Sequence, residues 1–275
     1  MRKRWLALVC LAAGTCGVIA ARCGAGDRQP VPAADGAVAV EFFAGIRSGQ
    51  LQVALVPHGY SLVTMRVRNN TSGVLSVSLP KSFAAVPTAR WQKQQMLRQQ
   101  GHTPSLGDGY VLDPNGSQGL AGSLSGPWAA QSPPGADAAA GEPQAGGDGP
   151  RPWILAPGQM VQFQLPSFCL EFGKPDPHRR IPYQIVELQD LNDRPVVQEL
   201  LDRFSAGTLD QRIVQLAVWH VANGVPWQVL ANVKVPRPGG RGGGGSVTPQ
   251  ELFAARQLAE SLPSYGSLSG SLGGR

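Results

Sequence analysis

The sequence predicts an α+β protein in which a small antiparallel β-sandwich, of the immunoglobulin-like kind, precedes a compact helical domain. Short β-type runs with period-two alternation occupy residues 38–88 and 152–174, and patterns of helical period occupy residues 175–235. Long Gly-, Pro- and Ala-rich stretches lie between and around these regions. The chain holds 35 Gly and 24 Pro, well above average usage, so these stretches are expected to be disordered.

Residues 1–21 have the form of a signal peptide. A basic start, MRKRW, precedes an apolar run that is too short for a spanning helix of about 20 residues. We expect cleavage after Ala20 or Ala21, with an uncleaved anchor as the alternative. Thr15 and Arg22 precede the two nearby cysteines, where a lipoprotein signal has small residues, so lipidation is not expected. The protein should be exported (periplasmic, cell-surface or secreted), with no membrane attachment in its mature form.

The charge of the mature chain does not favour nucleic acid as a partner. The full chain has a formal net charge of +6, from 24 Lys and Arg against 18 Asp and Glu. Three basic residues leave with the signal, so 21 basic and 18 acidic residues remain, scattered along the chain. The expected partner is an unknown protein or cell-surface component.

Residues 38–88 are predicted to form the first part of the sandwich. The β-type runs, separated by turn signals, are VAVEFFAG, QLQVALVPHGY, SLVTMRVRNNTSG and VLSVSLP. In the third run Val63, Met65 and Val67 alternate with polar residues, which gives the strand one buried face and one wet face. Residues 22–37 form a leader without periodicity and are expected to be disordered.

Residues 89–151 are predicted to be a low-complexity flexible insert. A polar helix could form at WQKQQMLRQQGH, but residues 113–150 are almost entirely Gly, Ala, Ser and Pro. Such a stretch cannot bury enough apolar surface to offset its ordering entropy. Replacing Thr103–Pro150 by a short Gly/Ser linker is therefore expected to leave unfolding nearly unchanged, because loop-closure cost grows only logarithmically.

Residues 152–174 are predicted to return to the sandwich. WILAPGQMVQFQLP has the form of two strands around a Pro-Gly turn, and SFCLEFGKP that of a further strand carrying Cys169. Neither these strands nor the earlier ones could cover a hydrophobic face alone. After export only Cys23 and Cys169 remain, so Cys169 is expected to be paired with Cys23, buried and inert, or chemically consumed.

Residues 175–235 are predicted to form a helical domain of three helices. Asp193 can cap the first, and the third can start at Pro226. The buried side of the first would consist of Val196, Val197, Leu200, Leu201 and Phe204.

The second of these helices, residues 208–224, has the clearest pattern in the chain. Thr208 and Gln211 have the spacing of a capping box, and Gly224 suits a left-handed C-terminal cap. Gln215 lies among apolar residues of this helix, so its carboxamide needs either a hydrogen-bond partner or a chemical role.

A Gly-rich linker at residues 236–247 is expected to lead to a tail helix at residues 248–262. Thr248 and Glu251 have the spacing of a capping box. The apolar stripe of this helix is thin, so we expect it to dock weakly or lie free, followed by a disordered tail at residues 263–275.

Several kinds of active site can be set aside. The four histidines are far apart in sequence, and none has a ligand-type residue four positions on, so no metal is expected. There is no Gly-x-Ser-x-Gly motif and no phosphate-binding loop. We expect no enzyme and no cofactor. The one enzymatic alternative is a cysteine peptidase using Cys169 and His220, which requires their side chains within hydrogen-bond reach.

Two short motifs resemble those of bacterial thioester domains. Phe168-Cys169-Leu170 is similar to the aromatic-Cys-aliphatic motif of that family, and VQLAVW at residues 214–219 is similar to its glutamine-bearing helix motif. The resemblance spans residues 166–222. It implies an internal thioester between Cys169 and Gln215, formed with loss of ammonia, that couples to amines on a target.

Trp219 and His220 are the expected supporting residues of this site. Trp219 lies one turn beyond Gln215 and could cover the bond. The layout of the chain also resembles a group of uncharacterised secreted bacterial proteins.

Two hypotheses for the function follow. The first is an exported non-enzymatic surface or periplasmic protein with a Cys169–Gln215 thioester for covalent attachment. The second is a structural or binding scaffold with a β-sandwich recognition module and no reactive bond.

Overall fold

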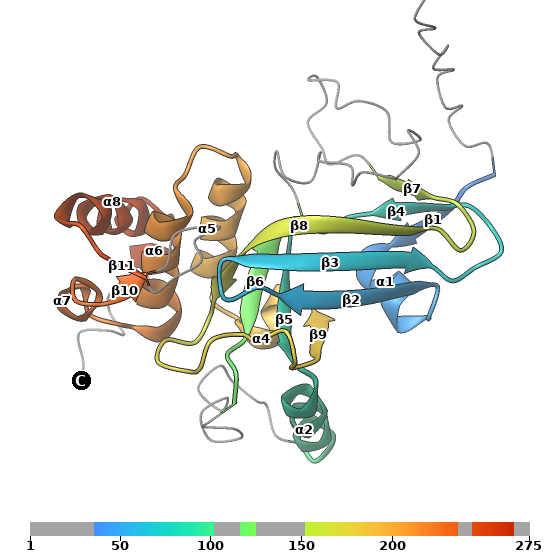
Figure 1. Ribbon diagram of the computed structural model, residues 1–275, viewed down its shortest axis with the longest axis horizontal. Coiled ribbons are helices and arrows are strands. Elements are labelled where there is room, and N and C mark those ends of the chain that lie inside the picture. Colours follow the sequence, from blue (N-terminus) through green and yellow to red (C-terminus); the bar gives the residue numbers. More distant parts are fainter. Residues whose placement is uncertain (1–35, 102–115, 125–151, 236–243, 267–275) are drawn as a thin grey trace, which may run out of the picture. The chain divides into compact units, whose positions relative to one another are not determined.

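The computed structural model describes residues 36–101, 116–124, 152–235 and 244–266 (Figure 1). All of them belong to one compact unit, residues 31–275. The predicted signal peptide and most of the predicted leader lie outside the described residues. The described part combines sheets and helices, which confirms the predicted α+β class.

Six strands form the main sheet, in the order β2-β3-β8-β6-β5-β9, and all neighbours are antiparallel. They are β2 (Leu51–Pro57), β3 (Leu62–Asn69), β8 (Met160–Cys169), β6 (Leu120–Ser123), β5 (Ser82–Pro87) and β9 (Tyr183–Val186). The sheet curves until its two edge strands, β2 and β9, approach each other, so it is a nearly closed barrel (Figure 1). The predicted immunoglobulin-like sandwich is not confirmed.

A smaller sheet has the order β1-β4-β7 and consists of β1 (Val38–Glu41), β4 (Leu75–Ser78) and β7 (Trp153–Leu155). Helix α1 (Phe42–Arg47) follows β1 directly, so the second half of the expected first strand is helical. The reason is a cap: the Glu41 carboxylate accepts from the backbone N–H of Phe43 and Ala44 at 2.9 and 2.7 Å.

Strand β6 is the main correction to the sequence prediction, because it lies within the segment expected to be a flexible insert. It runs between β8 and β5, and residues 120–124 are buried. A Cβ on Gly122 would lie 2.5 Å from the Phe83 ring, so close packing requires a small residue there. The expectation that Thr103–Pro150 is dispensable is wrong, because its removal would delete a central strand.

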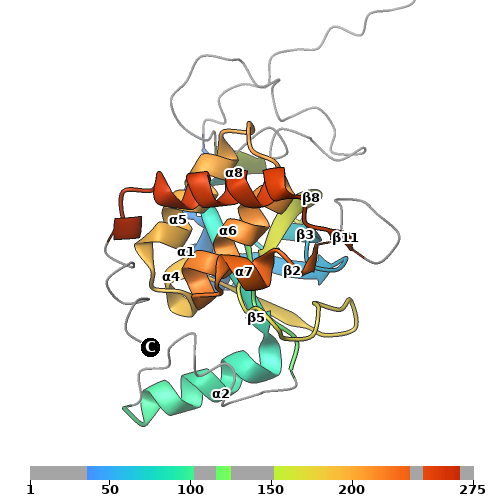
Figure 2. The same cartoon turned by 90° about the vertical axis from the view of Figure 1, so that its left-hand side faces the viewer.

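The remaining helices include a group at one end of the main sheet, and α2 lies apart from that group (Figures 1 and 2). They are α2 (Thr88–Gln99), α4 (Leu188–Leu191), α5 (Pro195–Ser205), α6 (Gln211–Asn223), α7 (Trp227–Leu230) and α8 (Pro249–Glu260). A short ribbon of β10 (Lys234–Val235) and β11 (Gly245–Ser246) leads into α8. Helix α6 packs against β8, α5 and α8 and is buried along most of its length.

The N-terminal caps of α6 and α5 differ from the sequence prediction. Asp210, not Thr208, caps α6, and its carboxylate accepts from the backbone N–H of Arg212 at 2.7 Å. A carboxylate next to the first turn also interacts favourably with the helix dipole. Asp193 does not cap α5, where the N-cap residue is Arg194. The predicted C-terminal cap of α6 is confirmed, since Gly224 has a φ of 69°.

Helix α8 has the predicted capping box of Thr248 and Glu251, but it does not lie free. It lies across α6 (Figure 2), with Ala255 and Ala259 fully buried. Alanines let the two helices approach closely, so a thin apolar stripe is enough for docking. Arg212 of α6 pairs with Glu251 at 2.7 Å, and this hydrogen bond helps to lower the Glu251 pKa to about 2.

The position of β6 leads to a test by substitution. Gly122→Ala would force a methyl group against the Phe83 ring, and overpacking of this kind costs about 1–3 kcal/mol. Gly73→Ala is the matched control, because a Cβ at Gly73 meets nothing within 4 Å. Chemical denaturation should show a clear loss of stability for the first variant and little change for the second. Equal stability of the two variants would contradict the placement of β6.

Candidate functional site

Cys169 and Gln215 meet where the main sheet joins α6. Cys169 is the last residue of β8, and both residues are buried, at 0% and 1% exposure. The Gln215 Oε1 accepts from the backbone N–H of Cys169 at 2.8 Å, and its Nε2 donates to the Cys169 carbonyl at 3.0 Å. The two predicted residues are therefore neighbours, and the carboxamide binds the backbone of Cys169 through both of its ends.

Gln215 takes the place of a neighbouring strand at the end of β8. Strand β3 pairs with β8 only as far as Pro166. The backbone N–H of Leu170 donates to the carbonyl of Gly119 on the β6 side at 3.0 Å. Backbone groups alternate in direction along a strand, so the N–H and C=O of Cys169 point the other way, toward α6. Buried backbone groups need partners, and Gln215 supplies both.

Three side-chain amides of α6 act together along this end of β8; we call Gln211, Gln215 and Asn223 the amide face. They lie four or eight residues apart and therefore on one side of the helix. The further bonds of this face are Gln211 Nε2 to the carbonyls of Ser61 (2.6 Å) and Ser167 (2.9 Å), Asn223 Nδ2 to the Leu170 carbonyl (2.9 Å), and the Phe172 N–H to Asn223 Oδ1 (2.9 Å). The amide face thus binds the backbone from Ser167 to Phe172.

Trp219 completes this side of α6 between Gln215 and Asn223. Its ring packs edge-on against Phe172, with centroids 5.3 Å apart, and lies 6.5 Å from the ring of Tyr60. Trp219 belongs to the same hydrophobic cluster as Cys169. Trp219 thus packs beside the pair, and its role as a supporting residue stays a prediction.

The Cys169 thiol is poorly suited to nucleophilic chemistry. Burial raises the pKa of this thiol well above its usual value, and the carboxylates of Asp176 and Glu171 raise it further. The thiolate is the nucleophile and metal ligand, so a thiol held protonated is inert. Cys169 is a free thiol in the structure, and Cys23, its possible disulfide partner, lies outside the described residues. In this setting Cys169 packs as a small apolar side chain.

His220 lies elsewhere on α6 and does not belong to the pair. Its Nδ1 is 2.9 Å from the carbonyl of Val225, which can only accept, so Nδ1 carries the proton. Its Nε2 then accepts from the hydroxyl of Tyr265 at 2.9 Å, and the ring stacks on Trp227. Both ring nitrogens are engaged, so the structure does not support His220 as a base for Cys169 or as a supporting residue of the thioester.

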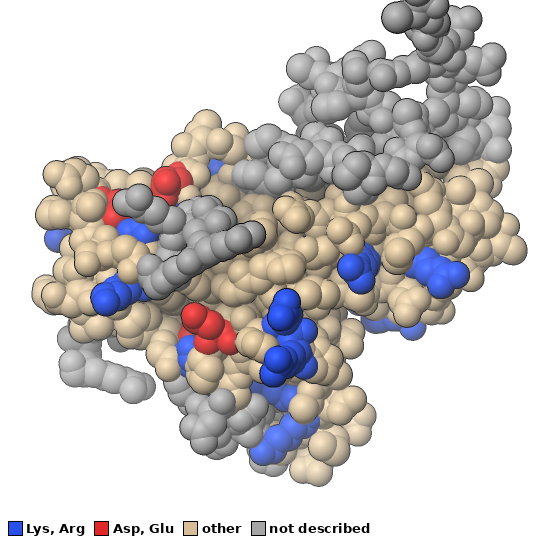
Figure 3. All heavy atoms as spheres, viewed as in Figure 1, with Lys and Arg blue, Asp and Glu red and all other residues tan. Residues whose placement is uncertain are grey.

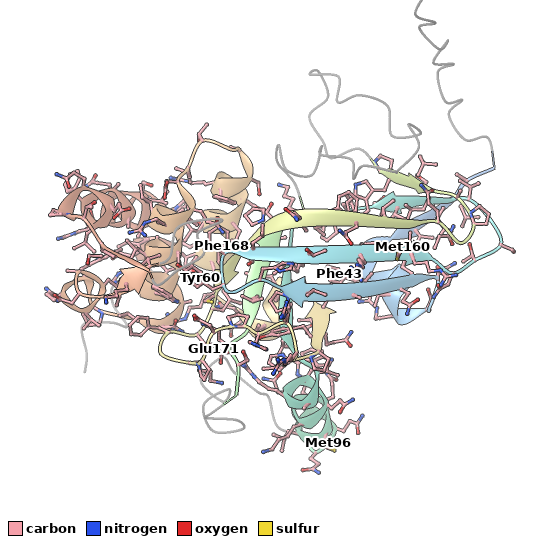
Figure 4. All side chains as sticks on the ribbon, viewed as in Figure 1. Phe43, Tyr60, Met96, Met160, Phe168 and Glu171 are labelled. Atoms are coloured by element: carbon pink, nitrogen blue, oxygen red, sulfur yellow. The ribbon has the colours of Figure 1, made fainter. Side chains whose placement is uncertain are left out.

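A buried ionic cluster beside Cys169 was not predicted. The side chain of Glu171, on the side of the main sheet toward α2 (Figure 4), contacts the guanidinium of Arg90 and lies 3.2 Å from Lys174 Nζ. It also accepts from the backbone N–H of Gly119 at 2.7 Å. All three charged side chains are fully buried. The sequence signal for this cluster was Glu171 and Lys174, an acidic and a basic residue three positions apart directly after an apolar run. Nothing in the sequence pointed to Arg90.

Two further features, a metal-binding group and a membrane-spanning helix, are not found in the described ranges. These residues contain no group of three or more His, Cys, Asp and Glu side chains that could hold a metal ion. None of their helices is long and apolar enough to cross a membrane.

Comparisons with models of protein families, with curated proteins and with solved structures gave no match. The resemblance to bacterial thioester domains therefore rests on the two short motifs alone.

The environment of His220 predicts a pH dependence of stability. Burial lowers the pKa of His220 below its usual value of 6.5. The unfolded chain therefore takes up the proton first, and the free energy of unfolding falls as the pH drops through the unfolded pKa near 6.5, until the folded pKa is passed. Denaturation of the His220→Gln variant from pH 8 to 5 should show a smaller fall than wild type. The exposed His178→Gln is the control, and an unchanged fall in His220→Gln would contradict the assignment.

Proposed function

We propose that this protein is an exported, non-enzymatic binding scaffold in which the contact between Cys169 and Gln215 is structural. The observation that carries the proposal is the double hydrogen bond of the Gln215 carboxamide to the Cys169 backbone. A buried glutamine with both ends satisfied has a full structural explanation. Export is supported by the form of residues 1–21.

The chemistry of thioester formation also favours a structural contact between Cys169 and Gln215 over a covalent bond. The Cys169 sulfur would attack the carboxamide carbon of Gln215, the C–N bond would break, and the nitrogen would leave as ammonia with the thiol proton. That reaction removes Nε2, the donor to the Cys169 carbonyl. It also needs a nucleophilic sulfur, and the raised pKa of the thiol opposes this.

A latent covalent adhesin is the second candidate. Direct contact between residues 46 positions apart and their near-complete burial favour it, because a thioester survives only where water is excluded. Coupling to a target amine would then require this junction to open.

Within the scaffold proposal, the β-rich half is the recognition module, in the manner of a small immunoglobulin-like β-sandwich. The helical half would be structural, since the polar groups of its amide face are used to bind the end of β8.

Intact mass of the exported, mature protein tests this proposal. The scaffold predicts the full sequence mass after signal cleavage, an unchanged mass after methylamine treatment, and a Cys169 thiol that titrates once the chain is unfolded. Cys169→Ala, which cannot form the bond, is the matched control. A wild-type mass lower by one ammonia, which then rises by the mass of one methylamine on amine treatment while Cys169→Ala stays unchanged, would overturn the scaffold and establish the adhesin.

A further inference from the structure

The outer face of β2, β3 and β8 carries arginines and amides without any carboxylate. We call it the arginine-glutamine face; its polar members are Gln52, Arg66, Arg68, Gln162 and Gln164, all exposed. The register places Arg68 opposite Gln52 on one side and Arg66 opposite Gln162 on the other. These side chains therefore stand together on one surface of three paired strands.

The surrounding sequence makes this face positive. No Asp or Glu occurs between Glu41 and Asp108, and none lies between Arg151 and Glu171. Figure 3 shows Lys and Arg but no Asp or Glu over these strands. Several acidic side chains of the described residues instead lie on helices, as with Glu251 on α8. The uneven distribution of acidic and basic side chains, more than the modest net charge, would attract an anion to this face.

Neither arginine of this face is paired with a carboxylate of the described residues. The Nε of Arg66 donates to the Oε1 of Gln162 at 2.8 Å, a neutral partner that orients the guanidinium and leaves its charge intact. Arg68 makes no ion pair with any described side chain. Being two residues apart on one strand, the guanidinium groups start from Cα atoms about 7 Å apart, so a linear anion lying along β3 could meet both.

The chemistry of the face selects among anionic partners. Guanidinium groups bind carboxylates through paired hydrogen bonds, and glutamine amides both donate to and accept from hydroxyl groups. The outward positions of the three strands carry no aromatic side chain, whereas proteins that bind single-stranded nucleic acid use aromatic rings to stack bases. We propose that the arginine-glutamine face binds an acidic polysaccharide through its carboxylates and hydroxyls. This inference rests on the proposed scaffold function and names the class of its partner.

Affinity measurements on the mature protein with polygalacturonate, at low ionic strength, test the inference. Wild type should bind, and added salt should weaken the binding. The Arg66→Gln/Arg68→Gln variant should lose affinity by about tenfold or more, because two charge-assisted contacts are removed. The control is Lys234→Gln/Arg256→Gln, which removes the same charge from β10 and α8 and should bind as wild type does.

Four outcomes would overturn the inference: no binding by wild type, equal losses in the two variants, equal binding of neutral dextran, or equal binding of single-stranded DNA. The first three exclude a specific polysaccharide face, and the last assigns the face to another class of polymer. These results are independent of the intact mass. Failed binding with a full mass removes only this partner class, whereas a mass deficit overturns the scaffold whether or not the polymer binds.

Discussion

The hydrogen bonds between the Gln215 carboxamide and the Cys169 backbone are the interaction on which the rest of the structure depends. Strand β8 joins the two halves of the main sheet, pairing first with β3 and then with β6. At its end one side has no strand neighbour, and α6 fills that side. Leaving a buried backbone group unpaired costs about 1–3 kcal/mol. Helix α6 also packs against α5 and α8, so the bonds of Gln215 help to hold the helical half to the sheet.

Much of this junction could be predicted from the sequence because it follows simple periodicities. Alternation located β2, β3 and β8 of the main sheet, and helical spacing located α5, α6 and α8. The isolated cysteine and the glutamine among apolar residues were recognised as a pair, and the structure brings Cys169 and Gln215 together. What the sequence could not decide was the kind of contact. A thioester and a hydrogen-bonded glutamine both require burial and proximity, so the same residues predict both.

The parts that were missed depend on contacts that local patterns do not encode. Strand β6 contains Gly122 and Ser123, so its composition resembles a linker, yet Gly122 is required by the ring of Phe83. The ionic cluster joins Arg90 to Glu171, 81 positions along the chain, which no local periodicity can show. The cap of α6 was placed two residues early because Thr208 has capping-box spacing, whereas the Asp210 carboxylate lies directly before the first turn.

A double-mutant cycle of Cys169→Ala and Gln215→Leu tests the central claim most directly. Alanine keeps the backbone groups that Gln215 binds, so Cys169→Ala should cost only a core truncation of roughly 1–3 kcal/mol. Gln215→Leu should be destabilising on its own, because it leaves both backbone groups unpaired. Because the two substitutions remove different interactions, a structural contact predicts a double variant clearly less stable than either single variant, even with the coupling that neighbouring residues show. A double variant no less stable than either single variant would contradict the account, since that is the result of losing one shared covalent bond.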